Sequence, residues 1–369
     1  MFQRSSSGCL AIFFAAGVMY AQAPKPDPDV LIFTNGDKLV GHLVSAAGGQ
    51  ITFKSDMIGE IKVDWKNIRE LHASQKFAVI PKGVKIVHKN EAPVPQGTIT
   101  VADQKIEVGA TPPQSIPVAN VSNIVSADAF QKAVMHSPGF FEDWSGTVTA
   151  GASLVEATQD SETFTAGISL VRAIPTENWL DARNRTLVDF TESYGTVSQP
   201  GSPTLKTSIY HAAAERDEYF SPRVYGFGQA DFDHNFSQGL DLQQRYGGGI
   251  GWTAIKDANQ TLDLKASMSY IDQQFAKSSA NKSLIGSTFA EAYLRKLVHG
   301  IAFNQKLSVT PAWNNTNAYS AIASAGLTLP TYKRLGVSLN ATDAFLNDPP
   351  PGFKKNSFQF TLGLTYSLR

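Results

Sequence analysis

The carboxyl-terminal segment SFQFTLGLTYSLR, residues Ser357 to Arg369, alternates between apolar and polar or small side chains. Its apolar positions are Phe358, Phe360, Leu362, Leu364, Tyr366 and Leu368. A period of two is that of a β-strand, whose successive side chains point to opposite faces. The apolar face can pack on a second sheet in a soluble sandwich or meet lipid in a membrane barrel, and one strand does not distinguish the two.

The same alternation recurs through the chain after residue 140. It is clearest in 148–154, 164–170, 262–270, 321–329 and 335–341, with short turns and longer polar loops between the strands. We count about twelve strands, and an even strand number with short turns at one end is typical of outer-membrane barrels. The predicted fold is therefore all-β, with a transmembrane antiparallel barrel of about twelve strands over residues 140–369.

If the apolar positions face lipid, the charged residues of the opposite parity line the lumen. The predicted lumen-lining residues are Asp181, Arg183, Arg185, Asp189, Asp231, Asp233, Arg245, Asp263, Lys265, Glu291, Arg295 and Lys306. The two signs are balanced among them, whereas a strongly selective porin more often shows a ladder of one sign. A sandwich could display these charges on its outer faces. It would not need strands as long as 178–190 or 261–272, which reach the roughly nine to eleven residues that cross a membrane.

Two further features bear on membrane insertion. Candidates for the aromatic belts at the membrane interfaces, or alternatively for core positions, are Trp179, Tyr246, Trp252, Tyr293, Trp313 and Tyr366. Outer-membrane assembly signals usually end on an aromatic residue, but here Arg369 is last and Leu368 precedes it. The signal read by the barrel assembly machinery is therefore shifted.

The first residues, 1–23, have the order of a secretory signal peptide. A positive residue precedes the apolar stretch CLAIFFAAGVM, and small residues follow it. The apolar stretch is too short to cross a bilayer as a helix. Cleavage after Ala23 would leave Pro24 at the first mature position, so cleavage after Ala21 is an alternative. Cys9 is the sole cysteine, and the exported protein would therefore contain no disulfide.

Residues 24–139 are predicted to form short strands with frequent turns. Asn-Gly at 35–36 and Gly-Gly at 48–49 are hairpin signals, because these residues accept the positive φ of tight turns. Three stretches recur further along: NGDKLVG as KGVKIVH, GGQITFK as QGTITVA, and DWKNI as NVSNI. We interpret the region as a small SH3-like β domain with an internal duplication, and one irregular β domain is the alternative. The turn Ser-Pro-Gly before residue 140 marks its boundary.

Four stretches resemble a known family. They are DWSGTVTAGASL, ERDEYFSPRVYGFGQADFDHN, RYGGGIGW and NDPPPGFKKNSFQFTLGL, within residues 144–369. In them the chain resembles the bacterial outer-membrane proteins of the domain of unknown function 481 family, also described as YdiY-like or salt-stress-induced. The amino-terminal β region resembles the periplasmic extension of some longer members. The resemblance implies an outer-membrane barrel with the preceding domain in the periplasm, and it implies no activity and no catalytic residues.

Motifs for catalysis and metal binding are incomplete. His211 lies near Ser208 and Glu215, as a lipase would need, but Ser208 and His211 have opposite parity and so point to different faces. DFDHNFSQGLDL begins like a calcium loop, yet it has phenylalanine at the turn glycine and leucine at the bidentate glutamate. A rim cation held by Asp231 and Asp233 is the remaining hypothesis. We predict no enzymatic activity, no cofactor and no dedicated metal site.

Glycine and proline stretches have structural interpretations. YGGGIGW lacks the Gly-Lys-Ser/Thr ending of a phosphate loop and lies in an alternating strand, so its glycines are predicted to relieve crowding inside a curved barrel. DPPPG is predicted to form a stiff loop, because proline presets φ. Acidic and basic residues are equal in number over the chain, and this argues against a nucleic-acid partner.

Two functions fit these observations. The first is a narrow, porin-like polar channel for small solutes or ions, for which the balanced charges predict small or no conductance. The alternative is a structural or envelope-stress anchor whose amino-terminal domain binds a periplasmic protein. The expected partners are outer-membrane lipid, the barrel assembly machinery and that periplasmic protein. The expected location is the outer membrane, with the amino-terminal domain in the periplasm.

Overall fold

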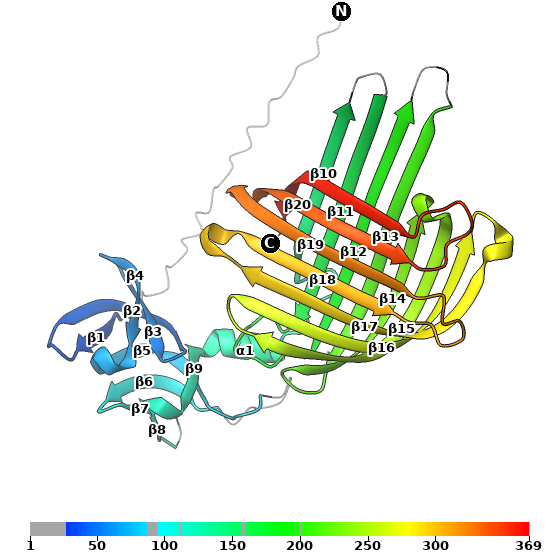
Figure 1. Cartoon of the computed structure of the whole chain (residues 1–369). Coiled ribbons are helices and arrows are strands. Elements are labelled where there is room, and N and C mark those ends of the chain that lie inside the picture. Colours follow the sequence, from blue (N-terminus) through cyan, green and yellow to red (C-terminus); the bar gives the residue numbers. More distant parts are fainter. Residues whose placement is uncertain are drawn as a thin grey trace, which may run out of the picture. The chain divides into compact units, whose positions relative to one another are not determined.

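A computed structural model describes residues 27–86, 94–110, 112–155, 160–198, 201 and 203–368. The predicted signal peptide, its cleavage sites and Arg369 lie outside these residues. The chain divides into two compact units, residues 1–134 and 135–369, which are coloured along the sequence in Figure 1. The predicted boundary after residue 139 lies shortly beyond this division. Each unit is described by itself.

The first unit is a single nine-stranded antiparallel sheet followed by a short helix. Its elements are β1 (Asp29–Phe33), β2 (Lys38–Ala47), β3 (Gln50–Ser55), β4 (Gly59–Asp64), β5 (Ile68–Pro81), β6 (Gln96–Ala102), β7 (Lys105–Val108), β8 (Gln114–Pro117), β9 (Val121–Ser126) and α1 (Ala127–Met135). The sheet encloses an apolar core that includes Leu31, Phe53, Leu71, Phe77 and Ile99. Both predicted hairpin turns are present, with Gly36 and Gly48 at positive φ.

The long strand β5 pairs with other strands on both of its edges. β1 pairs with β2 and with the first part of β5, whose other edge pairs with most of β6. The second part of β5 pairs with the start of β6 and with β9. One 3-10 turn, Trp65–Asn67, precedes β5 and another, Val118–Asn120, precedes β9. Of the predicted sequence matches, GGQITFK covers the turn before β3 and most of β3, and QGTITVA is β6. DWKNI covers the turn Trp65–Asn67, and NVSNI begins at the last residue of the turn Val118–Asn120 and continues into β9. The duplication itself stays a prediction.

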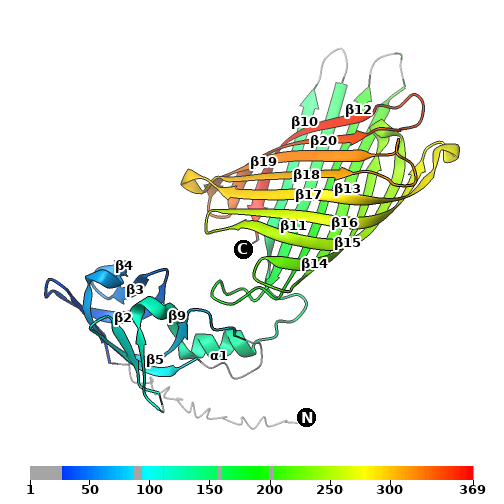
Figure 2. The ribbon, with the colours of Figure 1, turned by 60° about the horizontal axis from the view of Figure 1, so that its bottom comes forward.

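The second unit is a closed antiparallel barrel of twelve strands, as predicted. The strands are β10 (Trp144–Val155), β11 (Asp160–Ile174), β12 (Asn184–Ser198), β13 (Leu205–Tyr219), β14 (Val224–Asn235), β15 (Leu240–Lys256), β16 (Gln260–Phe275), β17 (Lys282–Lys296), β18 (Ala302–Thr310), β19 (Ser320–Tyr332), β20 (Leu335–Leu346) and β21 (Asn356–Ser367). Each strand pairs with the next, and β21 returns to pair with β10 (Figures 1 and 2). No sheet edge is left, which removes the unpaired backbone groups that lipid could not satisfy.

The last strand, β21, shows which face of the barrel wall carries its apolar side chains. Phe358 and Leu364 are each 67% exposed on the outside of the barrel, whereas Ser357 and Thr365 are buried on the inside. Four of the six predicted aromatic residues lie on the outer face: Tyr246, Trp252 and Tyr366 are exposed there, and Tyr293 pairs with the outward Leu262. The other two, Trp179 and Trp313, lie in connections. The outer wall is therefore apolar and the inner wall polar.

The two ends of the barrel differ. We call the end at which β10 begins and β21 finishes the terminal end, and the opposite one the loop end. Terminal-end connections are mostly tight, as in the turn after β15, where the Asp257 carboxylate accepts the N–H groups of Asn259 and Gln260 at 2.8 Å. These hydrogen bonds lower the pKa of Asp257.

Within the described part of the chain, no helix has the length and apolar character needed to cross a membrane.

Candidate functional site

The barrel interior holds most of the predicted lumen residues. Those on the inner face are Arg185, Asp189, Asp231, Asp233, Arg245, Asp263, Lys265 and Lys306. Because residues paired across antiparallel strands share a face, the register carries this assignment around the barrel from one strand to the next. They form two networks, one toward the terminal end and one further toward the loop end.

The terminal-end network is centred on Arg185. Its Nε lies 2.6 Å from Asp217 Oδ2 on the neighbouring strand, and its Nη1 lies 2.8 Å from Asp263 Oδ2. Asp263 belongs to β16, so the guanidinium spans the lumen from β12. Lys265 forms a second ion pair, with Glu215 of β13. Asp217 is fully buried, and the side chain of its partner Arg185 is 17% exposed.

An aromatic side chain packs beneath these charges. The ring of Tyr225 is fully buried, and the Arg185 guanidinium lies 5.2 Å from its centroid. Gly251 makes room for this ring, since a Cβ atom there would collide with it. The prediction that the glycines of YGGGIGW relieve crowding inside the barrel is confirmed at this position.

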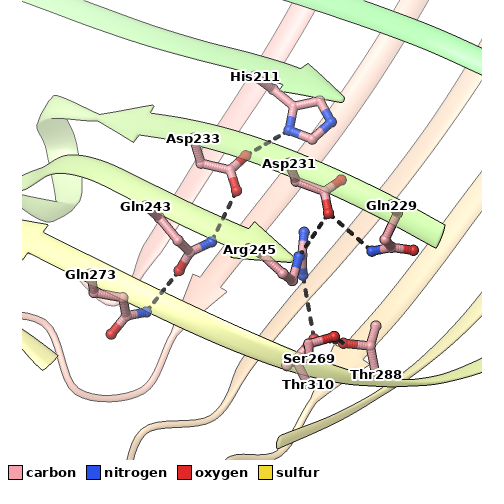
Figure 3. Close-up of polar contacts among 10 residues, drawn as sticks. All are labelled: His211, Gln229, Asp231, Asp233, Gln243, Arg245, Ser269, Gln273, Thr288 and Thr310. Carbon is pink, nitrogen blue, oxygen red and sulfur yellow. Dashed lines mark hydrogen bonds and ion pairs between the residues drawn. The ribbon is translucent and has the colours of Figure 1, made fainter. Parts of the chain in front are cut away.

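The second network is drawn in Figure 3. His211 Nδ1 lies 2.6 Å from Asp233 Oδ1, and Asp233 Oδ2 accepts from Gln243 at 2.9 Å. Gln243 in turn accepts from Gln273 at 2.7 Å. This chain runs from β13 through β14 and β15 to β16. Asp233 thereby has both carboxylate oxygens occupied, one by the His211 imidazole and one by the Gln243 amide.

Asp231 is the centre of the other group of contacts drawn in Figure 3. Its carboxylate accepts from Arg245 Nε at 3.1 Å and from Gln229 at 2.9 Å. Arg245 also reaches Thr310 at 3.5 Å, and a hydroxyl chain continues from Thr310 through Thr288. These contacts occupy both carboxylates that were considered for a rim cation. Among the residues that the structure describes, no cluster of three or more histidine, cysteine or acidic side chains is placed to hold a metal.

Two contacts join opposite walls. Lys306 Nζ of β18 lies 3.2 Å from Asp189 Oδ2 of β12, strands that are opposite in the closed order. At the loop end, Gln238 lies between β14 and β15 and donates to Ala344 O at 2.9 Å and to Lys355 O at 2.7 Å. Ala344 and Lys355 flank the loop 347–355, which connects β20 with β21 on the far side of the barrel.

Further contacts hold the loop 347–355 over the loop end. Lys282 Nζ donates to Asp348 O at 2.6 Å and pairs with Asp348 Oδ2 at 2.7 Å. The side chain of Phe353 occupies the space beside Gly239, where a Cβ atom would collide with it. Below them, Leu240, Phe275 and Leu346 form a buried apolar cluster. We call the contacts that Gln238, Lys282 and Phe353 make at the loop end, together with this apolar cluster, the latch.

Two predicted lumen residues lie outside the strands. The predicted strand 178–190 begins later, at Asn184, so Asp181 and Arg183 lie in the connection between β11 and β12. A hydrogen bond from Leu180 N to Glu177 O at 3.2 Å forms a turn there and interrupts the strand. The strand register therefore assigns neither side chain to the lumen.

Two others lie on the outer face. Glu291 stands opposite Leu264 in the register, and Arg295 shares its parity, so neither points into the lumen. The inner positions of this strand are Ala290 and Ala292, small residues that leave room beside the ion pairs of β16. Glu291 and Arg295 lie toward the terminal end of β17, where an outward charge can reach the membrane interface.

The sequence interpretation missed Glu215 and Asp217. They belong to the run ERDE, residues 215–218, which puts charges on both parities. Alternation therefore could not assign a face, and the pairing of Asp217 with Arg185 did. Ser208 shares a face with Tyr194 on the outside, whereas His211 points inside, so the lipase-like residues are not brought together.

A family model described as "Protein of unknown function, DUF481" matches residues 148–368, more than half of the chain. The chain belongs to the DUF481 family. This confirms the family that the sequence resemblance indicated. No curated protein matches this DUF481 chain.

The chain also matches solved structures of bacterial proteins. The DUF481 chain is 13% identical to the COG4313 outer membrane channel from Pseudomonas putida F1, covering 63% of this chain and all of that one, with a TM-score of 0.36. It is 10% identical to the β domain of the Bordetella autotransporter BrkA, covering 61% and 97%, with a TM-score of 0.30. It is 13% identical to the translocator domain of the autotransporter NalP from Neisseria meningitidis, covering 60% and 87%, with a TM-score of 0.31.

Proposed function

We propose that this DUF481 protein is an outer-membrane anchor with a closed lumen, which holds its amino-terminal β unit in the periplasm. The apolar outer wall supports the membrane location, because large side chains such as Phe289, Met268 and Leu364 are exposed on it. In water such a wall would favour aggregation, whereas lipid satisfies it. The polar interior is that of a membrane barrel, not of a sandwich core.

The latch is the observation that carries the proposal. Gln238 is only 4% exposed. Its two hydrogen bonds connect the turn between β14 and β15 to β20 and the loop 347–355 on the opposite side of the barrel. Below it, cross-lumen ion pairs of Arg185 and Lys306 occupy the interior. An ion passing through would have to separate these contacts, so the barrel in this state should conduct poorly or not at all.

The amino-terminal unit supports an anchoring role. Residues 27–134 have a core of their own, which a simple pore would not need. A barrel that fixes such a unit beside the membrane raises its local concentration near any partner held in the same place. A periplasmic protein that binds this unit is therefore part of the proposal.

A gated narrow channel is the second candidate. The side chain of Lys306 is 60% exposed and that of Asp189 is 22% exposed, so water reaches one side of the lumen at their level. Opening of the latch would connect this wet side to the exterior. The channel hypothesis thus requires movement of the loop 347–355.

Single-channel recording of the full chain in a planar bilayer tests both candidates. We expect silence from the natural chain, and discrete steps from it would contradict the closed lumen. The double variant Gln238→Ala, Lys282→Met removes the hydrogen bonds and the ion pair that these two side chains contribute to the latch. Steps from this variant alone would favour the gated channel. Gln274→Ala, an exposed position at the same end, is the matched control. A heat-dependent gel shift verifies that each variant is folded.

Protease treatment of cells tests the location of the amino-terminal unit. We expect it to be protected in intact cells and digested once the outer membrane is permeabilised. Digestion in intact cells would contradict a periplasmic position. Insensitivity in both conditions is checked against the detergent-solubilised chain, which must be cleaved for the comparison to count.

A further inference from the structure

The segment that precedes the barrel, residues 136–143, is held in place by one buried guanidinium. Arg172 Nε donates to Glu142 O at 2.9 Å, and its Nη2 donates to Gly139 O at 2.8 Å and to Pro138 O at 3.1 Å. Arg172 is only 9% exposed. A side chain that satisfies three carbonyls in this way fixes the path of the backbone around it.

Further hydrogen bonds close this segment on itself. Gly139 N donates to Glu142 Oε2 at 2.8 Å, and Glu142 N donates to Gly139 O at 3.1 Å. The indole N–H of Trp144 donates to Phe140 O at 2.8 Å. The polar groups of the segment are thereby turned toward one another and toward the barrel wall.

The apolar side chains of the segment remain uncovered. Phe140 is 69% exposed and Phe141 is 89% exposed. Their rings are 5.1 Å apart in an edge arrangement, and Phe140 also lies 6.2 Å from Trp144. Exposure of two adjacent aromatic rings to water is unfavourable. A backbone that holds both rings outward therefore presents them to a non-aqueous environment.

The position of Arg172 identifies what meets these rings. It pairs with Trp144 and shares its strand face with Leu170 and Ile168, so it lies on the outer wall. The segment therefore continues the apolar outer wall at the terminal end. Outward aromatic residues at the same end are Phe220, Trp252, Tyr332 and Tyr366. Aromatic residues concentrate where a barrel wall passes from acyl chains to headgroups.

We infer that Phe140 and Phe141 form a membrane anchor that inserts into the lipid leaflet at the terminal end of the barrel. Arg172 is the positioning residue that presents them. The anchor holds the chain at the membrane surface immediately before β10. It therefore determines where the chain that precedes residue 140 leaves the lipid. Its charged neighbours, Glu142 and Asp143, are acidic, so attraction to anionic lipid does not drive the insertion. The inference rests on the proposed membrane location.

Depth-dependent fluorescence quenching tests the anchor in the full chain, folded in vesicles. An environment-sensitive dye is attached at Phe141→Cys, with Phe289→Cys as the mid-wall reference and Met57→Cys as the reference in the first unit, all carrying Cys9→Ser. Met57 is 93% exposed and so is a matched apolar position. Spin labels are placed on the lipid either near the headgroup or near the chain end.

We expect the dye at Phe141 to be quenched more by the shallow label than by the deep one. The dye at Phe289 should be quenched more by the deep label, and the dye at Met57 by neither. No quenching at Phe141 would overturn the anchor, and so would a blue shift without quenching, because protein would then cover the site. Equal quenching at Met57 and Phe141 would also overturn it. Failure at Phe289 would instead contradict the membrane barrel itself.

A second variant tests the positioning role. Arg172→Gln combined with Phe141→Cys should lose most of the shallow quenching, although the dye-bearing position is unchanged. Arg172→Lys should retain more of it, because an ammonium can still donate to carbonyls. High salt should leave the quenching of the parent unchanged, and loss of quenching in salt would contradict an apolar anchor.

Discussion

Lys306 Nζ and Asp189 Oδ2 lie 3.2 Å apart although their strands, β18 and β12, stand opposite each other in the barrel. The side chain of Lys306 is 60% exposed, so solvent screens the pair, and it should stabilise the fold by less than about 1 kcal/mol. Its importance is geometric. At this level two side chains span the whole lumen.

Removal of the lysine should widen any path that ions take. In the Gln238→Ala, Lys282→Met background, Lys306→Ala is expected to raise the unitary conductance in a planar bilayer. If the Gln238→Ala, Lys282→Met protein shows no conductance steps, adding Lys306→Ala and Asp189→Ala to it is expected to produce none either. Unchanged steps after loss of Lys306 would mean that ions do not pass between these two walls.

Arginine substitutions on adjacent residues of β21 should differ in cost. Leu362 faces outward in mid-strand, and Leu362→Arg should cost about 2 to 4 kcal/mol because a charge at the membrane midplane is poorly solvated. Thr361 faces the polar interior, so Thr361→Arg should be milder. Denaturant titration of refolding into vesicles measures both. Equal midpoints would contradict the assignment of the two faces.

Loss of the Arg185 guanidinium should be costly. Arg185→Gln leaves the fully buried Asp217 without its cation, and breaking a buried pair in this way typically costs about 3 to 5 kcal/mol. The same titration measures it, with the solvated Lys306→Gln as the control. Adding Asp217→Asn and Asp263→Asn should recover part of the loss. No recovery would show that packing on Tyr225, and not charge, dominates.

A methyl group at Gly251 should disturb the interior. Gly251→Ala places a Cβ against the Tyr225 ring, and such overpacking typically costs about 1 to 3 kcal/mol. Gly228→Ala is the matched control, because a Cβ there meets nothing within 4 Å. Tyr225→Leu in the Gly251→Ala background should restore part of the stability. If both glycine variants behaved alike, crowding would not explain Gly251.

The sequence alone determined the barrel and its two faces. Alternation in segments such as 357–368 has a single structural cause, the period of the strand, and it recurs often enough to fix the strand number and the polarity of the wall. Eight of the twelve predicted lumen residues follow this rule onto the inner face. The rule failed where a turn replaced a strand, at Asp181 and Arg183, and where small residues alternate with charges, at Glu291 and Arg295.

Only the tertiary structure decided which interior side chains contact one another. Barrel closure brings Asp189 to Lys306 and Gln238 to Lys355, pairs that are far apart in the sequence and carried by opposite walls. It also turns Arg172 outward beneath residues 138–142, which leaves Phe140 and Phe141 uncovered. A local pattern reports the face on which a side chain lies. Which side chains meet across the barrel depends on strand register and curvature, and these are set by the closed sheet as a whole.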